Sequence, residues 1–106
     1  MKKYEAMFII KPDLKEEDKT AVLKSIKDLV GKHHGVVTQD QIWAERRKLA
    51  YDLFPVGGGI RYKEGLYYLV NFDVDPSAIT LLKSVYGLNE SILRYLILRL
   101  EEKKVS

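Results

Sequence analysis

The stretch Gly65-Leu66-Tyr67-Tyr68-Leu69-Val70-Asn71-Phe72 decides which fold this 106-residue chain can adopt. A glycine followed by aromatic, β-branched and other apolar residues is typical of a β-strand. Residues 36–53, which precede it, are also rich in β-forming types and are interrupted by a charged run, so they predict one long strand with a bulge. Residues 54–59 contain a proline and three glycines, which are typical of a turn. The two strands are therefore predicted to pair as a hairpin.

A strand and a helix are predicted before this hairpin. Residues 4–10 form the strand, and Pro12 ends it because proline lacks a backbone donor. Asp13 and Glu16 have the spacing of a capping box and begin an amphipathic helix, which Gly35 ends. The apolar face of that helix has helical spacing and consists of Val22, Ile26, Leu29, Val30 and His33.

A second helix and a last strand are predicted after the hairpin. Asp75 and Pro76 are typical of a helix start, and Gly87 follows the last apolar residue of that helix. Residues 92–100 then predict a strand. The order β-α-β-β-α-β is that of an α+β, ferredoxin-like fold, in which a four-stranded antiparallel sheet carries two helices on one face.

The composition narrows the class of protein. Apolar residues make up 46% and charged residues 31% of the chain, which is typical of a folded domain. We expect one domain over residues 1–100 and a charged C-terminal tail over residues 101–106. The chain has no cysteine for disulfides or thiolate metal sites. No uncharged stretch approaches the ~20 residues of a membrane-spanning helix, so we expect a cytoplasmic protein. The net charge of +3 permits a polyanionic partner without requiring one.

The polar residues form no recognisable catalytic pattern. His33 and His34 project about 100° apart on a helix, so they cannot both bind one metal ion without a further ligand. Gly57-Gly58-Gly59 lacks the lysine and hydroxyl residue of a phosphate loop and is typical of a hairpin tip. The paired glutamates lie at a helix start and in the tail. We therefore predict no enzymatic activity, no cofactor and no metal site.

Alternation along the strands separates a helix-covered face of the sheet from an open face. The covered face is predicted to hold Tyr4, Ala6, Phe8, Ile10, Tyr68, Val70, Phe72, Tyr95 and Ile97. The open face is predicted to hold Met7, Ile9, Tyr67, Leu69, Leu96 and Leu98, interleaved with Asn71 and Arg94. This second set is unusually apolar for a surface that meets water. We expect a protein partner, a second copy of the chain, a wider core or a loop of the chain itself to cover it.

The run Arg46-Arg47-Lys48-Leu49-Ala50-Tyr51 resembles the Arg-Arg-x-Leu-Ala-Tyr signature of the bacterial ribosomal protein S6 family. Similar features follow in order along nearly the whole chain: Tyr4-Glu5, Pro12, Trp43, Gly65-Leu66-Tyr67-Tyr68, and Ile92-Leu93-Arg94-Tyr95-Leu96-Ile97-Leu98-Arg99.

Three features depart from the pattern of that family. Asp52 stands where proline is usual, Trp43 lies one residue farther from Leu49, and the hairpin before Gly65 is longer. The extra residue would turn side chains to the other face of the sheet unless a bulge absorbs it. The longer hairpin is either a disordered tip or an additional RNA contact through Arg61 and Lys63.

The resemblance implies a structural protein of the small ribosomal subunit, with no catalysis. Such a protein would bind the central domain of small-subunit ribosomal RNA during assembly, as a heterodimer with ribosomal protein S18. The predicted RNA-binding residues are Lys2, Lys3, Tyr4, Arg46, Arg47, Tyr51, Arg94 and Arg99. The residues predicted to contact the protein partner are Arg46, Arg47, Met7, Ile9, Tyr67, Leu69 and Leu96. For Tyr51, packing at the end of a strand is an equally good interpretation.

The competing hypothesis is a homo-oligomeric, ferredoxin-like regulatory or small-molecule-binding domain. Such a domain would use the open face for self-association and would bind RNA weakly. A ribosomal protein that neutralises phosphates should instead bind RNA with an affinity that falls as salt rises.

Overall fold

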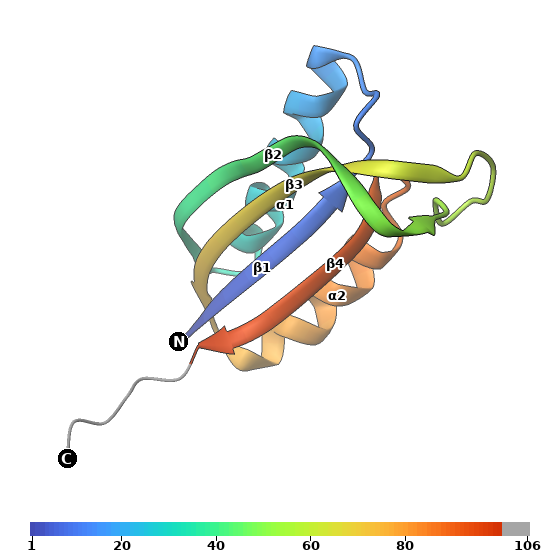
Figure 1. Ribbon diagram of the computed structural model, residues 1–106. Helices are drawn as coiled ribbons and strands as arrows, with labels where there is room; N and C mark the ends of the chain where they lie inside the picture. Colours follow the sequence, from blue (N-terminus) through green and yellow to red (C-terminus); the bar gives the residue numbers. More distant parts are fainter. Residues whose placement is uncertain (101–106) are drawn as a thin grey trace.

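A computed structural model describes residues 1–100 as a four-stranded sheet with helices on one side (Figure 1). Its elements are β1 (Lys2–Ile10), α1 (Glu16–Lys32), β2 (Val36–Leu53), β3 (Tyr62–Val74), η1 (Pro76–Ala78), α2 (Ile79–Gly87) and β4 (Ile92–Leu100). The strand order is β2-β3-β1-β4, and every neighbouring pair is antiparallel. The α+β, ferredoxin-like fold predicted from the sequence is confirmed. The predicted tail, residues 101–106, lies outside the described residues.

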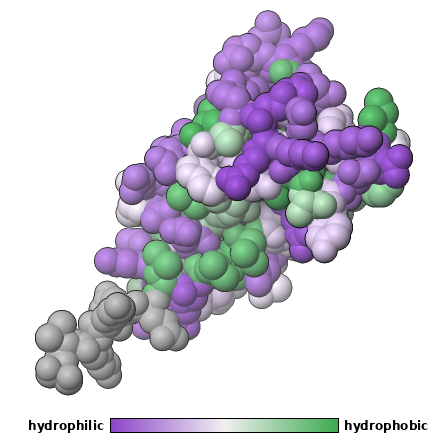
Figure 2. Space-filling view, viewed as in Figure 1, coloured by the Kyte–Doolittle hydropathy of each residue, from purple (hydrophilic) through white to green (hydrophobic). Residues whose placement is uncertain are grey.

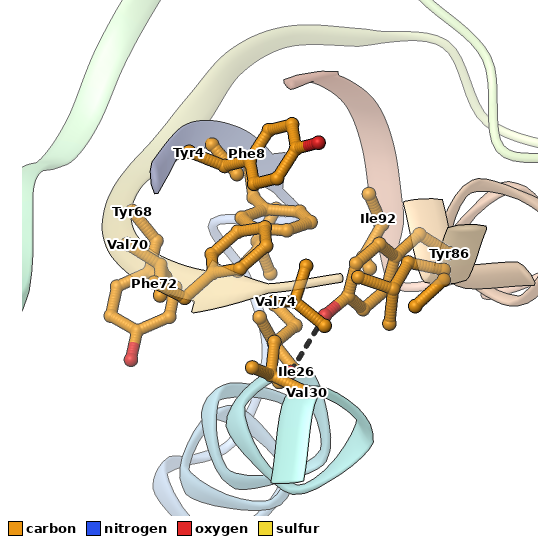
Figure 3. Packing of buried hydrophobic residues seen from close by; sticks show 14 of the residues in the cluster. Tyr4, Phe8, Ile26, Val30, Tyr68, Val70, Phe72, Val74, Tyr86 and Ile92 are labelled. Atoms are coloured by element: carbon orange, nitrogen blue, oxygen red, sulfur yellow. Dashed lines mark hydrogen bonds between the residues drawn. The ribbon is translucent and has the colours of Figure 1, made fainter. Parts of the chain in front are cut away.

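The core lies between the sheet and the two helices. Alternate residues of the two central strands point into it, so Phe8 on β1 and Val70 on β3 are completely buried. Figure 3 shows this packing and the hydrogen bond that the Tyr86 hydroxyl of α2 donates to the Ile26 carbonyl of α1, at 2.7 Å. The residues predicted for the covered face are buried in this core or, for Tyr95 and Ile97, packed against it. Burial of the Tyr86 ring also raises the pKa of its hydroxyl.

The start of α1 differs from the sequence prediction. The N-cap residue is Lys15, and no side chain caps the helix. Asp13 lies two residues earlier, in the turn after β1, where its carboxylate accepts a 3.4 Å hydrogen bond from the Tyr62 hydroxyl of β3. The predicted capping box is therefore wrong, because the turn at Pro12 carries Asp13 away from the helix end. Among residues 1–100, no helix is long and apolar enough to cross a membrane.

The end of α1 depends on Gly35 for space. The left-handed backbone position belongs to His34, with φ of 65°, and not to the glycine. Gly35 donates its N–H to the Val30 carbonyl at 2.9 Å, which ties the turn to the last part of the helix. A Cβ atom on Gly35 would lie 2.7 Å from the Asp73 carbonyl oxygen of β3 and 2.8 Å from Cγ1 of Val30. The glycine thus lets α1 return onto the sheet at β2.

We predict that Gly35→Ala lowers the free energy of unfolding by about 1–3 kcal/mol, because the added methyl group meets backbone that cannot move alone. Gly31→Ala is the matched control, since a Cβ atom there meets nothing within 4 Å. That substitution should raise the free energy of unfolding by up to about 1 kcal/mol through helix propensity. Urea denaturation of the three proteins measures both values, and equal stability of the two variants would contradict the role given to Gly35.

Candidate functional site

The sheet face away from the helices is apolar and open to solvent. Cross-strand pairing places Met7 of β1 between Leu69 of β3 and Leu96 of β4. Leu98, farther along β4, is 50% exposed, and Leu96 is 58% exposed. Figure 2, which looks onto this face, shows apolar atoms gathered along β4 and hydrophilic atoms above them. The structure therefore brings the predicted apolar residues together on one surface, which we call the open face.

A row of larger side chains crosses the open face next to these residues. Ile9 of β1 pairs with Tyr67 of β3 on one side and with Arg94 of β4 on the other. A shallow cavity of about 360 Å³ lies at this place, lined by Met7, Ile9, Arg94, Tyr95 and Leu96. Arg94 is exposed at its margin, so its guanidinium can reach a ligand that lies on the open face.

The two signature arginines lie on opposite sides of the sheet, next to a bulge in β2. Ala44 pairs with Tyr67 and Arg47 pairs with Gly65, so two residues of β2, 45 and 46, lie opposite the single residue Leu66. The bulge lies between Trp43 and Leu49. The predicted bulged strand is confirmed. Alternation of neighbouring residues places Arg46 and Arg47 in different surroundings.

Arg46 lies on the helix side of the sheet. Its Nη1 donates to Oε2 of Glu64 at 2.8 Å, and both side chains are about half exposed. A small polar cavity of about 270 Å³ lies beside this ion pair and is lined by Pro12, Asp13, Arg46, Arg61, Tyr62, Lys63 and Glu64. Burial of the Tyr62 hydroxyl, together with the Asp13 carboxylate beside it, raises the Tyr62 pKa.

Arg47 lies on the open face, against two aromatic rings. Its guanidinium carbon is 5.0 Å from the ring centre of Trp43 and 5.6 Å from that of Tyr67. The two rings are themselves 6.0 Å apart and meet edge to face. We call Trp43, Arg47 and Tyr67 the aromatic–arginine cluster. The sequence alone does not place Trp43 at the site, because its contact with Tyr67 depends on the pairing of β2 with β3.

The predicted basic residues form two groups at opposite ends of β1. Lys2 and Lys3 begin the strand, and the neighbouring Tyr4 pairs with Arg99 of β4. Arg94 pairs with Ile9 near the other end of β1. The six residue steps from Lys3 to Ile9 span about 20 Å, so a single phosphate of RNA cannot contact both groups.

Tyr4 and Tyr51 have opposite environments. Tyr4 is only 5% exposed, and its ring stacks on Phe72 in the core with ring centres 5.8 Å apart. The prediction that Tyr4 contacts RNA is therefore wrong, because alternation turns its side chain to the helix-covered face. Tyr51 is 80% exposed, so packing at the strand end is not its role, and its ring is available to a partner.

The long β2–β3 hairpin extends beyond the sheet and carries exposed apolar residues. Phe54, Val56 and Ile60 are each more than half exposed near its tip. Arg61 is engaged there in an ion pair, with its Nε 3.2 Å from Oδ2 of Asp52. Figure 2 shows apolar atoms at this tip, at the upper right of the view.

No cluster of three or more potential metal ligands occurs within residues 1–100. Comparison with known proteins then decides the family, because the family model described as Ribosomal protein S6 matches residues 3–99. The chain belongs to the ribosomal protein S6 family. The bacterial S6 resemblance read from the signature motif is thereby confirmed.

Relatives from distant bacteria agree with this assignment. The chain is 36% identical over 104 residues to small ribosomal subunit protein bS6 of Helicobacter pylori, covering 98% of this chain and 68% of that protein. It is 37% identical over 103 residues to the bS6 protein of Moorella thermoacetica, covering 97% of this chain and 98% of that protein. The crystal structure of 30S ribosomal protein S6 from Thermotoga maritima superposes with a TM-score of 0.79 at 25% identity, over 92% of this chain and 86% of that one.

Membership in the S6 family makes this chain a structural protein of the small ribosomal subunit and not an enzyme. It places the protein on the cytoplasmic ribosome.

Substitution of Tyr4 and Tyr51 tests whether the first is buried in the core and the second is exposed. We predict that Tyr4→Ala lowers the free energy of unfolding by about 3–5 kcal/mol, since it removes a buried ring from the core. Tyr51→Ala should change it by less than about 0.5 kcal/mol, because the ring is exposed. Urea denaturation measures both, and a large loss of stability for Tyr51→Ala would show that Tyr51 packs at the strand end.

Proposed function

We propose that this S6 protein binds the central domain of small-subunit ribosomal RNA together with ribosomal protein S18 during assembly. The observation that carries the proposal is the open face, an apolar surface that residues 1–100 leave exposed along β4. Leu96 and Leu98 remain at least half exposed there, although each lies beside other apolar side chains. Exposed apolar patches of this kind mark surfaces that associate with other macromolecules.

The chemistry of the open face favours a protein in contact with it. Met7, Leu69 and Leu96 form one apolar row, which a partner can desolvate without leaving a charge unpaired. In this proposal Met7, Ile9, Tyr67, Leu69 and Leu96 contact S18, as the sequence predicts. Folded S6 therefore offers a preformed surface, which reduces the entropy lost on binding.

The basic residues around the open face favour a second, nucleic-acid partner. Lys2, Lys3 and Arg99 lie at one end of the sheet, and Arg94 lies near the other end. All four are exposed, so each can neutralise a phosphate at little cost in desolvation. Because the two groups are about 20 Å apart, they suit two segments of folded RNA better than one phosphate.

The two signature arginines complete the RNA part of the proposal. Arg46 faces the helix side beside Lys63, where an RNA phosphate would compete with Glu64 for its guanidinium. Arg47 faces the open face and so lies next to the residues proposed for S18. Tyr51, which is exposed on the hairpin, is free to stack on an unpaired base.

A binding experiment tests the proposal directly. The purified chain is titrated into a central-domain RNA fragment with and without S18, at low and at high salt. We expect tight binding when S18 is present, and an affinity that falls steeply as salt rises because phosphate contacts release counterions. A stable homodimer that binds neither S18 nor the RNA would contradict the proposal and support the regulatory-domain hypothesis.

Removing both signature arginines should weaken assembly without unfolding the protein. We predict that the double variant Arg46→Ala, Arg47→Ala loses about 1–3 kcal/mol of binding free energy for RNA and S18 together. Its stability should stay close to that of the wild type, because exposed ion pairs such as Arg46–Glu64 contribute little. Calorimetric titration measures the first quantity and urea denaturation the second. Unchanged assembly of the double variant would remove these arginines from the site.

A further inference from the structure

The aromatic–arginine cluster holds a guanidinium in a defined place on the open face. Arg47 lies within 5.6 Å of the ring centres of both Trp43 and Tyr67, which are on different strands. An arginine side chain in water samples many rotamers, whereas contact with two ring faces favours a narrow set of them. The cluster is thus organised before any ligand arrives.

The backbone of β2 creates this arrangement. One irregularity in pairing lies between Ile42 and Ala44, at Trp43, and another lies between Ala44 and Arg47. Each adds one residue to β2, so the two together leave residues 43 and 47 on the same side of the sheet, as their spacing of four requires. Gly65 lies opposite Arg47 on β3, and its lack of a side chain makes room for the Ile9 side chain, which a Cβ atom there would meet.

Arg47 has no carboxylate partner within residues 1–100. Its neighbours on the hairpin do have one, since Arg46 pairs with Glu64 at 2.8 Å and Arg61 pairs with Asp52 at 3.2 Å. The rings contact the guanidinium, but they do not bond to its five N–H groups, which lie in its plane and remain available to a ligand. Those donors have the fork geometry that binds a planar, two-oxygen anion.

We propose that the aromatic–arginine cluster is a receptor for a carboxylate of the protein partner, with Arg47 as the ligand-binding residue and Trp43 as a positioning residue. The inference rests on the proposed function, and it names the chemistry by which the open face recognises S18. The carboxylate is an Asp or Glu side chain or the chain terminus of the partner, bound bidentately by Arg47.

The surroundings of Arg47 favour a protein carboxylate over an RNA phosphate. Tyr67 belongs to the row of Ile9, and the next row consists of Met7, Leu69 and Leu96. Surfaces that bind nucleic acid are much more positive than this one. Tryptophan, tyrosine and arginine are also the residue types that dominate the affinity of protein interfaces. A charge pair formed here is shielded from water by the same apolar contacts that hold the partner.

Four variants test the assignment by calorimetric titration with S18 in the absence of RNA. Arg47→Gln removes the charge from the cluster, and Arg61→Gln removes the same charge from a hairpin arginine that is already paired with Asp52. Loss of a central interface residue typically costs a factor of about thirty in affinity, so we expect a loss of at least about tenfold for Arg47→Gln. Arg61→Gln should stay within about threefold of the wild type, because its exposed ion pair contributes little.

Two further variants separate charge from geometry. Arg47→Lys keeps the charge but has no planar fork, so its affinity for S18 should lie closer to that of Arg47→Gln than to the wild type. Trp43→Ala removes a ring that positions Arg47, and it should weaken S18 binding only while Arg47 is present. In the Arg47→Gln background, Trp43→Ala should therefore cost less than in the wild type.

Trp43 also reports on the site by fluorescence, since it is the only tryptophan of the chain and is 55% exposed. Adding S18 without RNA should shift its emission to shorter wavelength as the partner excludes water from the indole. Binding of S18 with no change in the emission would overturn the assignment.

The outcomes distinguish failure of this inference from failure of the proposed function. If the wild type does not bind S18, both are wrong. If it binds S18 and Arg47→Gln binds equally well, or if Arg61→Gln loses as much affinity, only the carboxylate receptor is wrong. If Arg47→Gln leaves S18 binding intact but weakens binding to the RNA fragment and lowers its salt dependence, Arg47 is a phosphate ligand.

Discussion

Burial of alternate residues of β1 and β3 beneath α1 and α2 is the interaction on which the remaining structure depends. Side chains such as Phe8 and Val70 are completely buried, so the register of the two central strands cannot slip without moving apolar groups into water. The same register fixes the opposite set, which includes Met7 and Leu69, on the open face. Two helices cover only one face of a four-stranded sheet. The functional surface is thus a direct consequence of the core.

A second constraint acts at the edge of the sheet, where β2 departs from regular pairing. β2 is the longest strand, from Val36 to Leu53, and its register against β3 shifts at several places. Each shift changes which side of the sheet the following residues face. Glu45 and Arg46, the two residues of one shift, both form ion pairs on the helix side, whereas Arg47 lies against aromatic rings on the open face. A short basic motif therefore serves two surfaces.

The two surfaces are separated by chemistry as well as by position. The open face is apolar and carries one organised guanidinium, whereas the strand ends and the hairpin carry exposed basic residues around it. An apolar surface binds a protein mainly by excluding water, while exposed basic side chains bind RNA mainly by releasing counterions. A structural protein of the ribosome gains from both, because assembly joins protein and RNA surfaces in one particle.

The sequence by itself determined the element order, the covered and open faces, and the family, because alternation, turn residues and the Arg46 to Tyr51 motif are local patterns. It also indicated a bulge near the arginines, since Trp43 stands one residue farther from Leu49 than in the family pattern. Tertiary structure alone decided where α1 begins and ends. The turn at Pro12 carries Asp13 away from the helix, and the close approach of the Asp73 carbonyl oxygen explains why residue 35 is a glycine. Only the structure placed Trp43 and Arg47 against Tyr67, because this contact depends on how β2 pairs with β3. Such pairing joins residues about twenty positions apart in sequence, and no local pattern specifies it.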